Sequence, residues 1–263
     1  ASQDTGVAAQ LLTDAGIAEH QVANLLGSIE GTDPDLGHEV VVIGAHIDHL
    51  GTDPVTGEIY NGADDNASGT VVMTELARLL AGSGWAPART VLFASWNAEE
   101  TGLEGSCHYT GDPSYPHEDT VAAISVDMVG AGDEAGLNLY GALYPDYVWL
   151  AQLMDLSAQD MGLPYDVFAN VPVLASDHVC FITQDIPAVM AQTTGMHEHY
   201  HTPLDTPENN SPGNLEAAAH LMWALLEPLA RGTEQPYLEE DWDPLAATGT
   251  SDPPVMAPPP ARL

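Results

Sequence analysis

The spacing of apolar residues changes between two patterns along the chain, and the order of those patterns predicts an α/β protein. Continuous apolar runs are typical of buried strands, and they occur at 21–29, 39–47, 90–96, 120–128 and 187–192. Apolar residues three or four positions apart are typical of amphipathic helices, and they occur over 1–20, 67–80, 146–161 and 214–229. Strands that alternate with helices predict a three-layer α/β sandwich, in which a mixed, mostly parallel, twisted sheet is flanked by helices.

Composition divides the chain into two parts. Residues 1–231 carry all the predicted elements, and a chain that is 44% hydrophobic can bury the core of one large domain. Residues 232–263 hold seven prolines without regular spacing, which predicts an acidic, Pro-rich tail with no core of its own. The two cysteines, Cys107 and Cys180, allow one disulfide or two free thiols. The chain begins at Ala1 with neither an initiator methionine nor an apolar leader, so we expect a mature or trimmed form.

The net charge limits the classes of partner. The 39 acidic residues face only four basic ones, all arginine, which gives a net charge of −35. Nucleic acids and anionic membranes need a basic patch, so we expect neither as a partner. Evenly spread charges would lie about 18 Å apart, well inside the Debye length of about 30 Å at 10 mM salt but far outside the roughly 3 Å at 1 M. We therefore expect a halophilic protein that is secreted or periplasmic; a secreted acidic protein of ordinary salinity and a calcium-binding surface are the alternatives.

Histidines and carboxylates gather where predicted strands end, which is where α/β proteins place their sites. They fall in five segments: 44–49, 61–69, 96–106, 124–130 and 197–206. In the first, His46 and Asp48 stand two positions apart and share one face of a strand. In the second, Asp64 and Asp65 precede a helix among small residues, where they would either bridge cations or simply cap the helix.

The other three segments add carboxylates beside buried strands. Glu99 and Glu100 are adjacent, which suggests that one binds metal and the other transfers protons, although a solvated pair is the alternative. Asp127 ends an apolar strand, where an unpaired carboxylate is costly to bury, so it requires either a metal or a hydrogen bond. His197, His199 and His201 alternate, but their spacing does not show which of them binds metal.

Together and in this order, the motifs resemble those of the di-zinc aminopeptidase family, which includes bacterial leucyl aminopeptidases, glutamate carboxypeptidase II and glutaminyl cyclases. The resemblance runs from about residue 21 to 229 and includes the Gly-Leu-Glu-Gly-Ser motif at 102–106 and Ser-Asp-His at 176–178. It implies two Zn²⁺ per chain and five zinc ligands: His46, Asp65, Glu100, Asp127 and His201. Asp65 would bridge the two ions, with Asp64 as its supporting neighbour, and Asp48 would orient His46. His197 and His199 become bystanders at the rim.

The resemblance also implies roles in the reaction. Glu99 would be the general base. Some family members stabilise the oxyanion with a tyrosine just before the Ser-Asp-His segment, but 172–175 contains none, and Tyr200 resembles the tyrosine that other members use. A packed aromatic is the alternative for Tyr200. Asp177 and His178 would contact the substrate.

The implied activity is that of a zinc-dependent exopeptidase, and within this class the sequence favours an aminopeptidase acting on peptides with a free N-terminus. Relatives that cut at a C-terminus need a cation to hold the substrate carboxylate, and four arginines leave few candidates. The alternatives are a carboxypeptidase-like relative, a glutaminyl-cyclase-like relative with one zinc, and a metal-free interaction module of the same fold.

Overall fold

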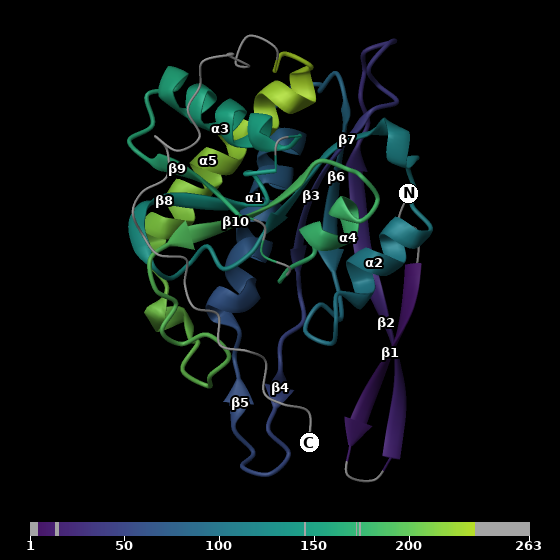
Figure 1. Ribbon diagram of the computed structural model, residues 1–263, viewed down its shortest axis with the longest axis vertical. Coiled ribbons are helices and arrows are strands. Elements are labelled where there is room, and N and C mark those ends of the chain that lie inside the picture. The colour runs from purple at the N-terminus through teal and green to yellow at the C-terminus, as the bar shows by residue number, and fades with distance from the viewer. Residues whose placement is uncertain (1–4, 14–15, 145, 172, 174, 235–263) are drawn as a thin grey trace.

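The computed structural model describes residues 5–13, 16–144, 146–171, 173 and 175–234, in which helices cover both faces of an eight-stranded sheet (Figure 1). The strands of the sheet are β1 (Thr5–Thr13), β2 (Gly16–Ile29), β3 (Val40–His46), β6 (Thr90–Trp96), β7 (Thr120–Val126), β8 (Asp133–Tyr140), β9 (Asp166–Asn170) and β10 (Ala188–Thr194). The helices are α1 (Gly69–Gly82), α2 (Glu104–Gly111), α3 (Val148–Asp160), α4 (His178–Ile182) and α5 (Pro212–Arg231). This arrangement confirms the predicted three-layer α/β sandwich.

The strand order β1-β2-β6-β3-β7-β10-β8-β9 places four parallel strands at the centre of the sheet. β3 pairs in parallel with β6 and β7, and β10 pairs in parallel with β7. β2 and β8 join this centre as antiparallel neighbours, so the sheet is mixed. The carboxyl ends of the four central strands therefore meet at one edge, which is where an open α/β sheet can form a site.

Side chains of the central strands alternate between two cores, one on each face of the sheet. Val41 and Ile43 of β3 share the larger core with Leu225 of α5, and α1 and α3 cover the same face. Val40 and Val42 belong to the smaller core, which α2 and α4 cover. Because both faces are buried, these strands are apolar at every position, which explains their continuous hydrophobic runs.

The first 20 residues were predicted as a helix, and that prediction is wrong. β1 and β2 instead form an antiparallel hairpin in which Thr5 pairs with Asn24 and Thr13 with Gly16. β2 continues into the main sheet, where Leu25–Ile29 pair with Val91–Ser95 of β6. Pairing with a neighbouring strand outweighs the local apolar spacing, which resembles that of a helix.

The remaining predicted elements are present, with ends that differ by a few residues, and the structure adds elements that the spacing did not indicate. These added elements are β8, β9, α2 and α4, together with a small ribbon of β4 (Gly51–Thr52) and β5 (Ile59–Tyr60) that extends from the loop after β3 (Figure 1). Cys107 of α2 and Cys180 of α4 form a disulfide, with their Cα atoms 5.0 Å apart. Within the described ranges, every helix is too short or too polar to cross a membrane. The predicted tail from residue 235 onward lies outside the described residues.

Candidate metal centre

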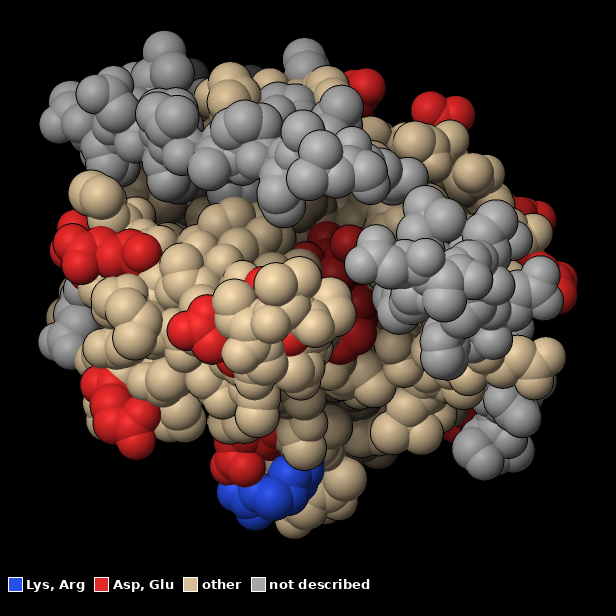
Figure 2. Space-filling view, turned by 90° about the horizontal axis from the view of Figure 1, so that it is seen from below, with Lys and Arg blue, Asp and Glu red and all other residues tan. Residues whose placement is uncertain are grey.

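The predicted ligands converge at the carboxyl edge of the sheet, although they come from distant parts of the sequence. Four of them end or follow the central strands, and the fifth precedes α1: His46 ends β3, Glu100 follows β6, Asp127 follows β7, His201 lies in the loop after β10, and Asp65 precedes α1. Seen from this end, the molecule is hollowed, and acidic atoms lie deep in the hollow (Figure 2). The five predicted ligands form two donor groups.

The first group, which we call the His46 group, consists of His46, Asp65 and Asp127. The Nε2 atom of His46 lies 3.2 Å from Asp65 Oδ1 and 3.3 Å from Asp127 Oδ1. All three side chains are buried, with at most 4% of each residue exposed. The second oxygen of Asp127 accepts a hydrogen bond of 2.7 Å from the Ser176 hydroxyl, which leaves Oδ1 facing the histidine.

The second group brings together potential ligand atoms of His49, Asp65, Glu100 and His201, which all lie within 4.8 Å of one another. We call Asp65, Glu100 and His201 the His201 group. The Nε2 atom of His201 lies 3.1 Å from Asp65 Oδ2 and 3.2 Å from Glu100 Oε2. Asp65 thus gives one oxygen to each group. Its carboxylate is the shared member, as the sequence motif implied.

The donor types and their separations fit zinc. A tetrahedral zinc ion about 2.0–2.1 Å from each nitrogen or oxygen donor holds these donors about 3.3 Å apart. The four separations within the two groups run from 3.1 to 3.3 Å. In addition, Asp127 Oδ1 is buried without a hydrogen-bond partner among the described residues, a state that a cation would relieve.

The electrostatics of the two groups also favour a cation. Burial alone would lower the pKa of His46, but the Asp127 and Asp65 carboxylates raise it well above its usual value. Burial likewise opposes charge on His201, yet Asp65 and Glu100 raise its pKa to about 9. Carboxylates this crowded stabilise any positive charge placed among them.

Asp48 holds His46 and the glutamate loop through different atoms. The Nδ1 atom of His46 lies 3.1 Å from the Asp48 main-chain oxygen but 3.9 Å from its carboxylate. The carboxylate instead accepts hydrogen bonds from the main-chain N–H groups of Glu99 and Glu100, at 3.0 and 3.1 Å. The expected orientation of His46 therefore comes from the carbonyl of Asp48, while its side chain fixes the turn that carries the two glutamates.

Asp64 faces away from both donor groups and anchors the loop that follows β10. Its Oδ1 accepts hydrogen bonds from the main-chain N–H groups of Gly130 and Ala131, and its Oδ2 lies 2.5 Å from His197 Nδ1. Asp205 ties the far end of the same loop to the turn before α1, because its carboxylate accepts from the N–H groups of Asp64 and Asp65. Both ends of the loop that carries His201 are thus held against Asp65.

Glu99 and Tyr200 belong to neither donor group but line the same hollow. Burial raises the pKa of Glu99 well above its usual value, and the nearby Asp127 and Asp177 carboxylates raise it further, although His46 opposes them. The Tyr200 ring stacks on His201 with a centroid distance of 3.8 Å. Burial and the surrounding carboxylates raise the pKa of Tyr200, so its hydroxyl keeps its proton.

Asp177 and His178 do not contact the hollow, which corrects the expectation that they touch the substrate. Each is only 1% exposed, at the start of α4. Burial raises the pKa of Asp177 to about 7 and lowers that of His178 to about 4. Asp177 nevertheless lies close enough to His46 and Asp127 to interact with their charges.

The backbone around the site is unusual in three places. Ala98, Met128 and His201 have φ values of 59°, 56° and 54°, a region that residues with a Cβ rarely adopt. Ala98 precedes Glu99, and Met128 follows Asp127. Such conformations cluster where a fold places functional side chains.

Sequence reasoning assigned no role to His49 or Asp205, although both contact the donor groups. His49 stands directly after Asp48 and was visible in the first motif, but nothing in its spacing indicated a contact with Glu100. Asp205 lies four residues after His201, in a Thr-Pro-Leu-Asp stretch that reads as an ordinary turn.

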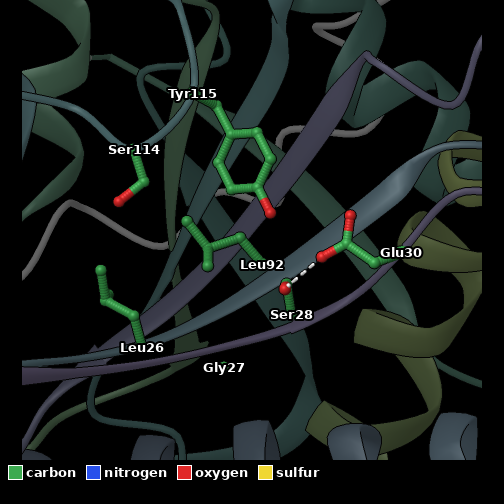
Figure 3. Close-up of a pocket in the computed structure, with 7 residues that line it drawn as sticks. All are labelled: Leu26, Gly27, Ser28, Glu30, Leu92, Ser114 and Tyr115. Carbon is green, nitrogen blue, oxygen red and sulfur yellow. Dashed lines mark hydrogen bonds between the residues drawn. The ribbon is translucent and has the colours of Figure 1, made fainter. Parts of the chain in front are cut away.

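A second hollow, of about 240 Å³, has a different character (Figure 3). Its lining is Leu26, Gly27, Ser28, Glu30, Leu92, Ser114 and Tyr115. The one carboxylate there, Glu30, accepts a hydrogen bond of 2.7 Å from the Ser28 hydroxyl. These residues include no histidine and only one acid, so the metal chemistry belongs to the hollow at the carboxyl edge.

Comparisons with known proteins agree with this geometry. The chain is 30% identical over 207 residues to aminopeptidase YwaD of Bacillus subtilis (strain 168), a match that covers 75% of this chain and 43% of that protein. An aminopeptidase from Aneurinibacillus sp. strain AM-1 superposes with a TM-score of 0.68 at 25% identity, covering 82% of this chain and 50% of the other. BSAP, a zinc aminopeptidase from Bacillus subtilis, superposes with a TM-score of 0.68 at 26% identity, covering 82% and 53%.

The chain thus spans about half the length of these relatives. The sequence model described as peptidase family M28 matches residues 24–226, which is most of the chain. The chain therefore belongs to peptidase family M28.

Proposed function

We propose that this chain is a zinc-dependent aminopeptidase that releases N-terminal residues from peptides. The observation that carries the proposal is the position of the Asp65 carboxylate between the two donor groups. Its Oδ1 lies 3.2 Å from His46 Nε2 and its Oδ2 lies 3.1 Å from His201 Nε2, and Glu99 lines the same hollow. The names of the relatives, aminopeptidase YwaD and the zinc aminopeptidase BSAP, support the same activity.

In this proposal the chain holds two zinc ions. His46, Asp65 and Asp127 would hold one ion, and Asp65, Glu100 and His201 the other. What zinc supplies when bound is a polarised substrate carbonyl and a lowered pKa for water. A full donor set in both groups favours this activity over a metal-free interaction module and over a cyclase with a single zinc.

The chain's own residues transfer the protons and stabilise the negative charge that develops on the substrate oxygen. Glu99 is free of both donor groups, so its carboxylate can accept a proton from the attacking water and pass it to the leaving amine. Tyr200 lies on His201 with its hydroxyl as a donor for the oxygen that becomes negative when the carbonyl is attacked. Asp48 keeps Glu99 in place by holding its main-chain N–H.

The charge around the site favours a substrate with a free amino group. Three arginines lie within the described residues, and each is paired with glutamate: Arg78 with Glu75, Arg89 with Glu39 and Glu234, and Arg231 with Glu227. Arg89 precedes β6, at the opposite end of that strand from Glu99 and Glu100. The hollow thus contains carboxylates that can bind the ammonium group of a substrate. None of the described arginines is free to bind a substrate carboxylate there.

Hydrolysis of leucine-p-nitroanilide tests the proposal, with N-acetyl-leucine-p-nitroanilide as the matched control. We expect release of nitroaniline from the first compound only, loss of this activity on dialysis against EDTA, and recovery when zinc is restored to about two ions per chain. Preference for the acetylated compound, or turnover that survives chelation, would contradict the proposal. Ring closure of a glutaminyl peptide without hydrolysis would favour the cyclase.

We also propose that the protein works outside the cytoplasm, in a high-salt setting. Its net charge of −35 is not concentrated in the metal centre, which accounts for only a handful of carboxylates. The disulfide between Cys107 and Cys180 supports an oxidising compartment.

A further inference from the structure

His49 lies at the edge of the His201 group and contacts one of its members. Its Nδ1 atom is 2.8 Å from Glu100 Oε1, and its ring meets the ring of His201 edge to face, with centroids 5.7 Å apart. Only 9% of the His49 side chain is exposed. A buried imidazole at this distance from a carboxylate donates a hydrogen bond to it.

The two oxygens of Glu100 have different partners. Oε2 lies 3.2 Å from His201 Nε2, at the spacing of donors around one ion, whereas His49 contacts Oε1. His49 Nδ1 is also 3.7 Å from Asp65 Oδ2, farther than the 3.1 Å that separates His201 from the same atom. His49 thus lies within hydrogen-bonding distance of Glu100 but farther from the shared Asp65 than His201 does, an arrangement that suits a hydrogen-bond donor to Glu100 better than a zinc ligand.

The backbone opposite His49 is shaped to admit its ring. Gly62 has a φ of 63°, and a Cβ on Gly62 would lie 2.7 Å from His49 Cγ and 2.5 Å from the Asp65 main-chain oxygen. A side chain at position 62 would thus push the imidazole away from Glu100. The segment that carries Asp65 leaves room for His49.

We propose that His49 is a positioning residue that sets the affinity of the His201 group for zinc. The inference rests on the proposed zinc function. By donating to Oε1, His49 fixes the rotation of the Glu100 carboxylate and leaves Oε2 free to bind the ion. Hydrogen bonds to ligating carboxylates of this kind change metal affinity by about 10- to 100-fold when they are removed.

Two substitutions separate positioning from ligation. His49→Leu removes the donor and keeps the bulk, whereas His49→Asn places an amide N–H where Nδ1 stood but supplies a poor zinc ligand. Each full-length protein is stripped of metal and titrated with Zn²⁺ in competition with a coloured chelator, which resolves tight and weak sites without using activity. We expect His49→Leu to weaken one of the two zinc sites by about 10- to 100-fold and leave the other unchanged. His49→Asn should stay within about threefold of the parent protein.

The outcomes that overturn the inference are distinct. If His49→Leu binds both ions as tightly as the parent, His49 does not position Glu100; if His49→Asn loses as much affinity as His49→Leu, His49 is a ligand. His199→Leu is the control, a neighbouring half-buried histidine for which we assign no contact with either group. If the parent binds two ions and His49→Leu weakens one site, but the parent does not hydrolyse the anilide, the proposed function fails while the role of His49 stands.

Discussion

The Asp205 carboxylate accepts a hydrogen bond of 3.0 Å from the main-chain N–H of Asp65, the residue shared by both donor groups. Its other oxygen accepts from the N–H of Asp64 at 2.8 Å, and Asp205 is only 2% exposed. Substituting Asp205→Asn replaces one acceptor by an amide donor and leaves a buried N–H without a partner. We expect a loss of about 1–3 kcal/mol in the free energy of unfolding, measured by urea denaturation in 1 M NaCl to screen the change in charge.

Asp33→Asn is the matched control for this measurement. Asp33 also accepts from two main-chain N–H groups, those of Asp35 and Leu36, but it does so in a partly exposed loop. Both N–H groups bond to the same oxygen, Oδ1, which the asparagine amide retains, so the loss should be smaller. If both substitutions lowered the free energy of unfolding equally, the hydrogen bonds from Asp64 and Asp65 to Asp205 would contribute no more than those of an exposed loop.

Substituting Glu99→Gln should separate proton transfer from metal binding. The amide cannot accept a proton, so we expect kcat for leucine-p-nitroanilide to fall by about 10²- to 10⁴-fold. Zinc content should stay at the parent level, because Glu99 is in neither donor group. Glu104→Gln, an exposed acid in the first turn of α2, serves as the control. Parental turnover by the Glu99 variant would refute its assignment as the base.

Substituting Tyr200→Phe removes a hydroxyl and keeps the ring that stacks on His201. If the hydroxyl stabilises the developing negative oxygen, kcat should drop by about 100-fold or more while KM changes little. Zinc content should not change. Tyr115→Phe, in the separate hollow of Figure 3, is expected to leave both constants intact. A change confined to KM would assign Tyr200 to substrate binding instead.

His178 should make stability depend on pH. Burial lowers its pKa to about 4, against about 6.5 in an unfolded chain, so the folded protein excludes a proton that the unfolded chain binds between these values. The free energy of unfolding is therefore unaffected by His178 above pH 6.5. As the pH falls from 6.5 to about 4, His178 lowers this free energy by roughly 3 kcal/mol. Burial raises the pKa of Asp177 to about 7, so Asp177 contributes in the opposite sense over the same range, and His178 is isolated by comparing the parent with His178→Gln. With EDTA present, so that zinc release does not contribute, the melting temperature of the parent relative to this variant should fall as the pH goes from 6.5 to 4. Identical slopes for the two proteins would contradict the assignment.

The net charge predicts a strong response to salt. Between 10 mM and 2 M NaCl the Debye length falls from about 30 Å, which exceeds the roughly 18 Å between evenly spread charges, to less than about 3 Å. We therefore expect the melting temperature at pH 7.5 to rise by roughly 5–10 °C over this range. Near pH 4.1, the calculated isoelectric point, the rise should shrink because most of the net charge is gone. A melting temperature that does not change with NaCl concentration at pH 7.5 would argue against a high-salt setting.

The fold and most of the site residues could be predicted because four of the five ligands end or follow an apolar run, and the fifth, Asp65, precedes a helix. His46 and Asp127, for example, close the runs that became β3 and β7, and parallel strands bring such ends together. What could not be predicted depends on the course of loops. His49 reaches Glu100 because the chain turns after β3, and no spacing in the sequence encodes that distance.

The N-terminal hairpin shows the other limit. The spacing over 1–20 fits a helix, yet β1 pairs along its whole length with residues 16–24 of β2, and residues 25–29 of β2 join β6. Long-range pairing decided the structure there, and local spacing carries no information about it. α2 and α4 are too short for a periodic signal, and a disulfide joins them.

The spread of the ligands along the sequence has a consequence for biosynthesis. His46 lies near the start of the domain, whereas His201 lies after the last strand of the sheet, so no N-terminal fragment that stops short of residue 201 contains both donor groups in full. A chain still being translated cannot complete the shared centre on Asp65 until most of the domain has left the ribosome. The His46 group is complete once residue 127 has been made, whereas the His201 group needs residue 201, so a truncated molecule would lack the His201 group.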